Sequence, residues 1–337
     1  MPLTSEQEKK IFDKFEAELS RICITPSKIL SEDLSSVLLS TGKRIRPRLA
    51  LLCASLGRVD PKQIIPVMVI LELAHNASLM HDDVIDNASI RHGVPTINAI
   101  RNDKLAILAG NYLLGMIEKY SEQHLKFTVA DSIRRNMKRN NPSATFNMHS
   151  INHLICDMSL GEYMQYEVAF SIEQQNLEHY FNRIKLKTGL LMRYCCISGG
   201  STGHLSRKQV QFLSDMGLSF GMAFQIADDI LDYDGNLSIG KTVGQDFMCG
   251  LCNLPMICAL ERNKNDEIIR LFEKREKSQA EIDRLVKFVI ENGGIEDAVK
   301  YRDEYTEKAL TELERFKEDE NRNNLAKFIS SIATRTF

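Results

Sequence analysis

The sequence lacks most of the features that mark a specialised class of protein. Its 337 residues carry a formal net charge of -2, so no basic field predicts a nucleic-acid partner. No run of about 18 or more apolar residues is present, and no membrane span is therefore expected. Fixed-period repeats and low-complexity tracts are also lacking. What remains is a chain with 43% hydrophobic and 26% charged residues, which is ample for a large core.

The eight cysteines lack the spacing of a disulfide framework, which favours a reducing compartment. The pair Cys249 and Cys252 is formally C-x-x-C. It has no second pair for zinc and no thioredoxin-like context, so we interpret it as incidental. The N-terminal residues MPLTSEQEKKIF match neither a signal peptide nor an Arg-rich transit peptide. We therefore expect a cytoplasmic protein, or a mitochondrial one if a transit peptide has been removed.

Segments that alternate between apolar and polar residues are scarce, whereas helical patterns are frequent. Thr4 and Gln7 have the spacing of a capping box before an amphipathic segment. Pro47 is expected to open a helix at its first position, and Pro66 is expected to lead into a long apolar helix. Gly293 and Gly294 predict a helix stop. The sequence therefore predicts an all-α protein with one large domain over residues 1–337.

Residues 119–150 differ from the rest of the chain. They hold a basic run followed by Asn140-Asn141-Pro142-Ser143, which is typical of a loop. We predict a polar, partly helical surface insertion. The basic run is interpreted as a solvated face in preference to a phosphate or partner patch.

An acidic cluster, Asp82, Asp83 and Asp86, ends the long apolar run. On a helix, Asp82 and Asp86 share a face, and packing carboxylates so closely costs energy through like-charge repulsion. Mg²⁺ would relieve that cost, because it takes oxygen ligands and often joins carboxylates to substrate phosphates. The alternative is a polar helix end that happens to be acidic.

A second cluster repeats the D-D-x-x-D spacing at Asp228, Asp229 and Asp232, again late in an apolar helix. Two such clusters are much less expected by accident. If the two helices lie side by side, six carboxylates line the mouth of an apolar groove. Metal ions held there would stabilise charge on a departing diphosphate, and the apolar helices below would house a carbon chain.

Basic residues that could meet phosphate oxygens occur in suitable places. Lys43 and Arg46 lie on a turn that contains glycine, and Arg91 follows the first cluster. Lys187 lies in an apolar helix, and Lys241 lies in the loop after the second cluster. A single lysine at any of these places would usually be an ordinary surface residue, so the interpretation depends on the presence of all these basic residues together.

With these motifs the chain resembles the trans-isoprenyl diphosphate synthases of the polyprenyl synthetase family, and within it the long-chain synthases of the heptaprenyl type. The matching blocks are collinear over about residues 40–260. They are GKRIRP, ELAHNASLMHDDVIDNASIRHGVPTIN, LAGNYLL, IKLKTGLL, GMAFQIADDILDYDGN and GKTVGQDFMCGLCNLPMICAL.

The resemblance implies a single helical bundle around a central apolar cavity, the isoprenoid synthase fold. It also implies an enzyme that uses Mg²⁺, or Mn²⁺ as a substitute, to ionise an allylic diphosphate. The allylic cation is then attacked by the double bond of isopentenyl diphosphate, a proton is lost, and the cycle repeats. The expected product is a long-chain all-trans polyprenyl diphosphate, C30–C50, for quinone side chains.

The resemblance also assigns residues to roles. The implied metal ligands are the aspartates of both clusters: Asp82, Asp83, Asp86, Asp228, Asp229 and Asp232. The implied catalytic set is Asp82, Asp83, Asp86, Lys187, Asp228 and Asp229. The implied ligands of isopentenyl diphosphate are Gly42, Lys43, Arg46, His75 and His92. The implied ligands of the allylic diphosphate are Arg91, Lys187, Thr188, Gln225 and Lys241. Without the resemblance, His75 would be interpreted as a core-facing helix histidine.

Ala77 and Ser78, five and four positions before Asp82, are predicted to set the product length. Small side chains there leave a tunnel open into the next helical turn, about 5.4 Å deeper. In family terms, bulky aromatic residues at these places resemble short-chain enzymes. We therefore expect a product longer than farnesyl.

Several positions depart from the family pattern. His92 stands where a second arginine is usual, which predicts weaker binding of isopentenyl diphosphate unless the imidazole is protonated. Asn111 replaces a Gly-Asp, and Leu251 and Asn253 stand where Lys and Thr are often found. These changes keep open a partner-dependent or weakly catalytic subunit of a heteromeric synthase. A geranylgeranyl diphosphate synthase is a further alternative, and a terpene cyclase or a metal phosphohydrolase ranks lower.

The expected partners follow from the same resemblance. They are the two diphosphate substrates and either a second copy of the chain or a different synthase subunit. A peripheral membrane contact during product release is also expected. No nucleic-acid partner is expected.

Overall fold

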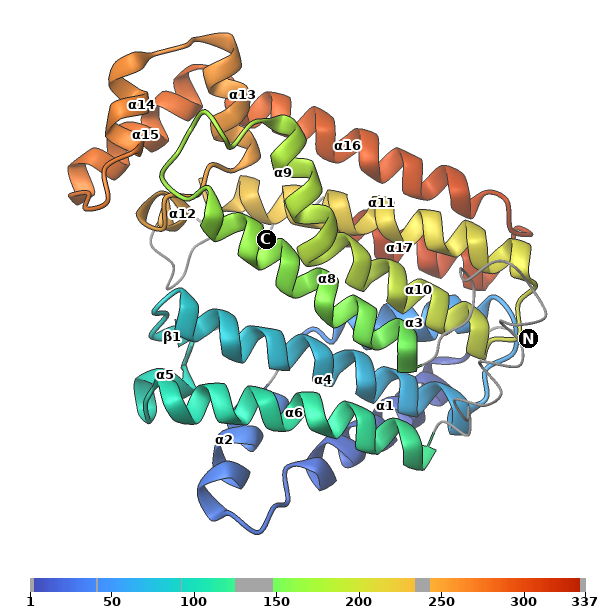
Figure 1. The fold of residues 1–337 in the computed structure, drawn as a ribbon. Helices are drawn as coiled ribbons and strands as arrows, with labels where there is room; N and C mark the ends of the chain where they lie inside the picture. The colour runs from blue at the N-terminus through green and yellow to red at the C-terminus, as the bar shows by residue number, and fades with distance from the viewer. Residues whose placement is uncertain (1–2, 41, 92, 125–147, 234–242, 334–337) are drawn as a thin grey trace. The chain divides into compact units, whose positions relative to one another are not determined.

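The computed structural model describes residues 3–40, 42–91, 93–124, 148–233 and 243–333 (Figure 1). The helices before residue 125 are α1 (Ser5–Ile22), α2 (Lys28–Leu38), α3 (Ile45–Ser55), α4 (Pro61–Ile85), α5 (Ile97–Ile100) and α6 (Asp103–His124). Those in the middle of the chain are α8 (Met148–Glu167), α9 (Leu177–Ile184), the π-helical turn η1 (Lys185–Gly189), α10 (Leu190–Thr202) and α11 (Arg207–Leu231). The last are α12 (Gln245–Met248), α13 (Leu254–Arg262), α14 (Asp266–Phe272), α15 (Gln279–Glu291), α16 (Gly294–Leu313) and α17 (Glu320–Ala333).

The predicted all-α class is confirmed. Within the described ranges the strands are β1 (Ile90–Arg91) and β2 (Val94–Pro95), which pair antiparallel as a short hairpin. Of the predicted insertion, residues 119–124 end α6 and residues 148–150 begin α8, and residues 125–147 lie outside the described residues.

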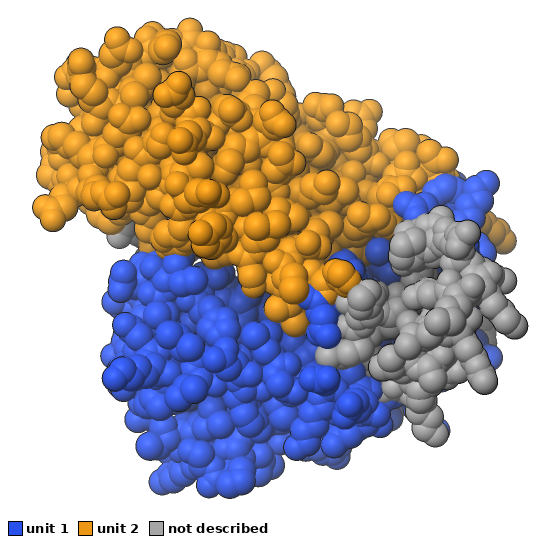
Figure 2. Space-filling model, in the orientation of Figure 1, with its two compact units in different colours: residues 1–152, 194–213, 318–325 blue, residues 153–193, 214–317, 326–337 orange. Residues whose placement is uncertain are grey.

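The chain divides into two compact units, which are coloured separately in Figure 2. Unit 1 comprises residues 1–152, 194–213 and 318–325. Unit 2 comprises residues 153–193, 214–317 and 326–337. The single domain over the whole chain remains a prediction.

In unit 1, α4 is the central helix, and α1, α2, α3, α5 and α6 all pack against it. Every residue from Ile64 to Ala74 is buried, as expected for a run that is apolar except for Glu72. By length and composition α4 could cross a membrane, but 78% of its most apolar stretch is buried inside the fold. That burial makes α4 the core helix of unit 1.

In unit 2, the core is built from aromatic and aliphatic side chains of α9, α11 and α12 to α16. Phe247 and Phe272 meet edge to face with ring centroids 6.1 Å apart, and both are fully buried. Tyr180 of α9 is also buried in this cluster. This packing fixes α9 and the end of α11 in one unit.

The helix starts confirm one sequence prediction and correct two. The capping box of Thr4 and Gln7 is present. Pro66 does not lead into α4 but lies inside it, because Asp60 caps the helix by accepting from the Lys62 amide and Pro61 occupies the first turn. Pro47 is the third residue of α3 and not the first. It is tolerated there because the amides of the first turn have no partner within the helix.

Candidate active site

Each unit carries one aspartate cluster with part of the predicted ligand set. Unit 1 holds Gly42, Lys43, Arg46, His75, Ala77, Ser78, Asp82, Asp83, Asp86 and Arg91. Unit 2 holds Lys187, Thr188, Gln225, Asp228, Asp229 and Asp232. His92 and Lys241 lie outside the described residues. The two clusters are therefore described one at a time.

The first cluster lies where α4 ends. Asp82 and Asp83 are in the last turn, and Asp86 is the C-cap, whose amide donates to the Asp82 carbonyl at 2.8 Å. Asp83 is buried, with 9% of its surface exposed, and Arg91 Nε donates to its Oδ1 at 2.5 Å. Asp82 and Asp86 are only half-buried. The middle aspartate thus has a protein cation as partner.

Arg91 reaches Asp83 because the hairpin folds back toward the end of α4. The Thr96 hydroxyl donates to the Ala88 carbonyl at 2.7 Å, and Asn98 Nδ2 donates to the same oxygen at 3.0 Å. These bonds satisfy a backbone acceptor in the loop and hold the hairpin in place. A cavity of about 60 Å³ lies beside the ion pair, and its lining includes Asp83, Arg91, Asn76, Ser36, Ser40 and Asn98.

The second cluster lies where α11 ends, with Asp228 and Asp229 in the helix and Asp232 just beyond it. The Tyr180 hydroxyl donates to Asp229 Oδ2 at 2.6 Å, and Gln225 Nε2 donates to Oδ1 at 3.0 Å. Asp229 is buried, and this burial raises the pKa of its carboxyl group to about 6. Asp228 and Asp232 are half-buried. Both clusters therefore bury the middle aspartate and leave the first and last nearer to solvent.

A close helix contact assembles the predicted allylic ligands. A Cβ on Gly221 of α11 would lie 2.7 Å from the Gly189 Cα, so the two glycines permit an approach that a larger residue would block. One turn along α11, Gln225 Oε1 accepts from the Thr188 hydroxyl at 2.7 Å. Thr188 lies in η1, and π-helical turns of this kind are frequent at functional sites. The contact therefore joins η1 to the helix that carries Asp229.

Lys187 is also held in a defined environment. Its Nζ forms an ion pair with Glu162 Oε2 of α8 at 2.5 Å, and its side chain is 30% exposed. A carboxylate at this distance from a lysine fixes the position of the ammonium group. Lys187 thus places a positive charge on η1, next to the close contact between η1 and α11.

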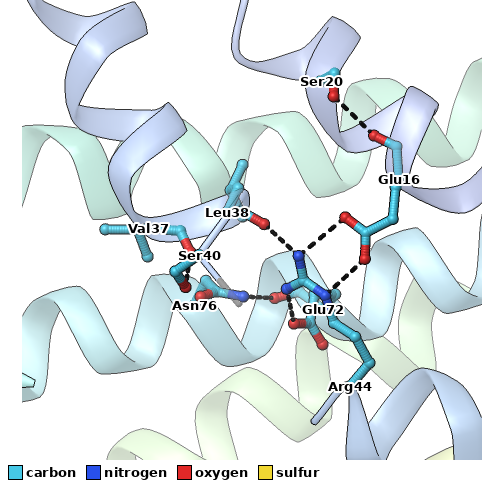
Figure 3. A network of polar contacts seen from close by, with 8 residues as sticks. All are labelled: Glu16, Ser20, Val37, Leu38, Ser40, Arg44, Glu72 and Asn76. Atoms are coloured by element: carbon cyan, nitrogen blue, oxygen red, sulfur yellow. Dashed lines mark hydrogen bonds and ion pairs between the residues drawn. The ribbon is translucent and has the colours of Figure 1, made fainter. Parts of the chain in front are cut away.

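The predicted isopentenyl diphosphate ligands of unit 1 come from two elements. Lys43 is exposed and Arg46 is half-buried on the turn into α3, and His75 is half-buried on α4. Figure 3 shows that Arg44, which lies between Lys43 and Arg46, joins this turn to α1, α2 and α4 through Glu16, Leu38 and Glu72. A weak signal for this network is present in the sequence, namely an acidic residue, Glu72, within an apolar helix.

The residues predicted to set product length differ in exposure. Ala77 has none of its surface exposed, whereas Ser78 is half-buried and donates its hydroxyl to the His75 carbonyl at 2.8 Å. Ser78 is therefore the position at which a larger side chain meets least resistance from the core.

The departures from the family pattern have separate structural settings. Asn111 is exposed on α6 and Leu251 is buried. Asn253 is the N-cap of α13 and also accepts from the Tyr233 hydroxyl at 2.5 Å. Its place at a buried helix start explains an asparagine there in terms of capping.

The carboxylates fit Mg²⁺ by their chemistry. Among the described residues, no three His, Cys, Asp or Glu side chains converge into a ready-made metal cage. Mg²⁺ does not require one, because it is usually held by one or two carboxylates together with waters and substrate phosphates. The half-buried pairs, Asp82 with Asp86 and Asp228 with Asp232, suit that mode. Asp83 and Asp229 are engaged by protein donors.

Sequence reasoning missed the side chains that hold the motifs. Tyr180 of α9 contacts Asp229, and Glu162 of α8 contacts Lys187. In the sequence, both appear as ordinary residues of their helices. Arg44 lies within GKRIRP, and the motif alone gives it no role. Only the fold brings these partners to the predicted residues.

The all-α fold, two D-D-x-x-D clusters at helix ends and a basic turn define an isoprenoid synthase type of protein. The Polyprenyl synthetase family model matches residues 27–289, and the chain belongs to that family. The heptaprenyl diphosphate synthase component 2 of Bacillus subtilis (strain 168) is 33% identical over 327 residues, which cover 96% of this chain and 88% of that protein.

Two further similarities agree with this membership. The decaprenyl-diphosphate synthase of Dictyostelium discoideum is 31% identical and is matched over 93% of this chain and 65% of its own length. The crystal structure of heptaprenyl diphosphate synthase from Staphylococcus aureus superimposes with a TM-score of 0.84 at 28% identity, covering 97% of this chain and 98% of that one.

Proposed function

We propose that the protein is a Mg²⁺-dependent prenyltransferase. It would condense isopentenyl diphosphate with an allylic diphosphate repeatedly to give a long-chain all-trans polyprenyl diphosphate, with C30–C50 favoured. The observation that supports the proposal most strongly is the structural similarity of the two aspartate clusters. Each ends an apolar helix, buries its middle aspartate against protein donors and keeps its outer aspartates half-buried.

Each part of the chain has a role in the proposed reaction. Bound Mg²⁺ supplies charge stabilisation for the diphosphate leaving group. In unit 1 the metal ligands would be Asp82 and Asp86, and in unit 2 they would be Asp228 and Asp232. Asp83 and Asp229 would keep the ends of α4 and α11 in place. The apolar helices would exclude water from the allylic cation, which would otherwise be quenched.

The basic residues divide between the two substrates. Lys43, Arg46 and His75 would bind the diphosphate of isopentenyl diphosphate. Lys187 would bind the allylic diphosphate, and Thr188 and Gln225 would orient it. Charge-assisted hydrogen bonds of this kind contribute about 1.5–3 kcal/mol each, so several together are sufficient for tight binding.

The direct test uses the full chain alone with Mg²⁺, labelled isopentenyl diphosphate and farnesyl diphosphate. We expect labelled products longer than farnesyl, separated by reversed-phase thin-layer chromatography after phosphatase treatment. Removal of metal with EDTA should abolish elongation, and Mn²⁺ should restore part of it. A chain that neither elongates nor binds either substrate would contradict the proposal.

A second candidate is a partner-dependent subunit of a heteromeric synthase. It is favoured by the name of the Bacillus subtilis relative, heptaprenyl diphosphate synthase component 2. The same assay separates the two candidates. Elongation by the chain alone supports a homomeric enzyme. Substrate binding without elongation supports the heteromeric enzyme if a second polypeptide restores elongation.

A further inference from the structure

Arg44 has a backbone conformation that a side chain of its size rarely adopts. Its φ of 48° and ψ of 44° are left-handed, and it is the N-cap of α3 without a side-chain capping bond. Such a conformation costs energy and persists only where the surroundings hold it. Here the arginine side chain itself supplies the restraint.

The guanidinium group is bonded on three sides (Figure 3). Nε and Nη2 donate to the two carboxylate oxygens of Glu16 at 2.8 and 3.0 Å. Nη1 donates to Glu72 Oε1 at 2.7 Å, and Nη2 also donates to the Leu38 carbonyl at 2.6 Å. The planar fork of arginine can make this set of bonds, whereas the single ammonium of lysine cannot reproduce it.

The three partners belong to three different helices of unit 1. Glu16 is on α1, Leu38 ends α2, and Glu72 is on α4. The Arg44 side chain is 10% exposed and that of Glu72 is 7% exposed, while Glu16 is 41% exposed. Because a buried ion pair is weak evidence for added stability, we infer that this network serves to fix the orientation of the turn.

The network connects the two elements that carry the proposed isopentenyl diphosphate ligands. Lys43 precedes Arg44 directly and Arg46 follows it by two residues. Glu72 lies one helical turn before His75 on α4. One guanidinium group therefore sets the position of the turn relative to the helix that bears the histidine.

We propose that Arg44 is a positioning residue for isopentenyl diphosphate, which holds Lys43 and Arg46 in register with His75. This inference rests on the proposed function, and it adds a residue to which neither the motif nor any substrate contact gave a role. The position of a charged ligand group matters because a misplacement of about 1 Å is enough to weaken binding or reaction strongly.

The test compares two substitutions in the network with one matched control. Arg44→Lys keeps the positive charge but loses the fork. Glu16→Gln weakens the exposed arm of the network and leaves Glu72 paired. The control is Arg101→Lys, because Arg101 also anchors α2, through Asp33 at 3.1 Å, and lies outside the network.

We expect Arg44→Lys to raise the Kd and KM for isopentenyl diphosphate by about tenfold or more. Glu16→Gln should raise them by about threefold. The KM for the allylic diphosphate and kcat at saturating substrate should change by less than about twofold in both variants. Arg101→Lys should resemble the wild type. Binding is measured by calorimetry on the full chain, and folding is monitored by thermal melting.

The outcomes separate this inference from the proposed function. If the wild type binds isopentenyl diphosphate and folded Arg44→Lys binds it equally well, the positioning role is wrong and the function stands. A selective change in KM supports the inference, whereas equal losses for both substrates indicate a purely structural role and overturn it. If Arg44→Lys does not fold, Glu16→Gln decides. If the wild type binds no isopentenyl diphosphate, the function and the inference fail together.

Discussion

The two aspartate clusters have the same spacing but different surroundings. In the first, the buried Asp83 is paired with a cation, Arg91, eight residues along the chain. In the second, the buried Asp229 receives hydrogen bonds from neutral groups, Tyr180 and Gln225. The comparison shows that one sequence pattern can be stabilised by two kinds of partner.

The difference has an electrostatic consequence. A cation compensates a buried carboxylate directly, whereas neutral donors stabilise the charge without cancelling it. Burial is the largest influence on Asp229 and raises its pKa to about 6, and the nearby charge of Asp246 acts in the same direction. The hydrogen bonds from Tyr180 and Gln225 and the charge of Arg183 act in the opposite direction.

The outer aspartates of the two clusters should contribute equally to the rate. We expect Asp82→Asn and Asp228→Asn each to lower kcat on the order of 10³-fold, because each loses a metal ligand that contributes several kcal/mol of charge stabilisation. The rate is measured at saturating Mg²⁺ and both substrates. The matched control is Asp13→Asn on an exposed face of α1, which should leave the rate unchanged. A large loss in only one variant would show that the clusters do different work.

Substitution of the middle aspartate should change the Mg²⁺ requirement by a different amount in each cluster. Asp83→Asn leaves Arg91 without its carboxylate, and we expect the Mg²⁺ concentration at half-maximal rate to rise by about 10- to 100-fold. Asp229→Asn should raise it by less than about tenfold, since Tyr180 and Gln225 can reorient to satisfy an amide.

The control for this pair is Tyr180→Phe, which removes one donor and keeps the Asp229 carboxylate. It should resemble Asp229→Asn in its metal requirement. Equal metal requirements in Asp83→Asn and Asp229→Asn would contradict the distinction between a cation-paired and a neutrally bonded carboxylate.

Substitution of His92, which follows the first cluster, should have a smaller effect. His92→Arg should lower the KM for isopentenyl diphosphate by about tenfold at pH 8, because it restores a permanently charged hydrogen-bond donor. An imidazole titrates near pH 6.5, so the wild-type KM should fall as the pH decreases from about 8 to 6. The variant should lose that trend. Parallel pH profiles in the two proteins would show that His92 does not contact this substrate.

The sequence predicted the helical class and the position of both aspartate clusters late in apolar helices, because both depend on local periodicity. It could not predict which side chains hold the site residues, since Tyr180 contacts Asp229 and Glu162 contacts Lys187 from other helices. It also misplaced the start of α4 at Pro66, because the capping by Asp60 outweighs the lost hydrogen bond of one proline. Long-range contacts thus determine the details on which the chemistry depends.

The helical turn before each cluster differs as well, and this difference gives the last prediction. Four positions before Asp82 stands Ser78, whereas four positions before Asp228 stands Phe224. Ser78→Phe would therefore make α4 resemble α11 at this point. We expect shorter products by thin-layer chromatography with little change in the rate of the first condensation, because an aromatic ring closes the space below the cluster without touching the carboxylates.

Ala77→Phe is the less suitable form of this experiment. Ala77 is fully buried, and a phenylalanine there would overpack the core of unit 1 at a cost of about 1–3 kcal/mol. Ser78→Ala serves as the control, since it removes the hydroxyl bond to the His75 carbonyl but keeps the position small. If Ser78→Phe gave the same chain-length distribution as Ser78→Ala, then α4 would not line the growing chain, and the limit on its length would have to come from other helices.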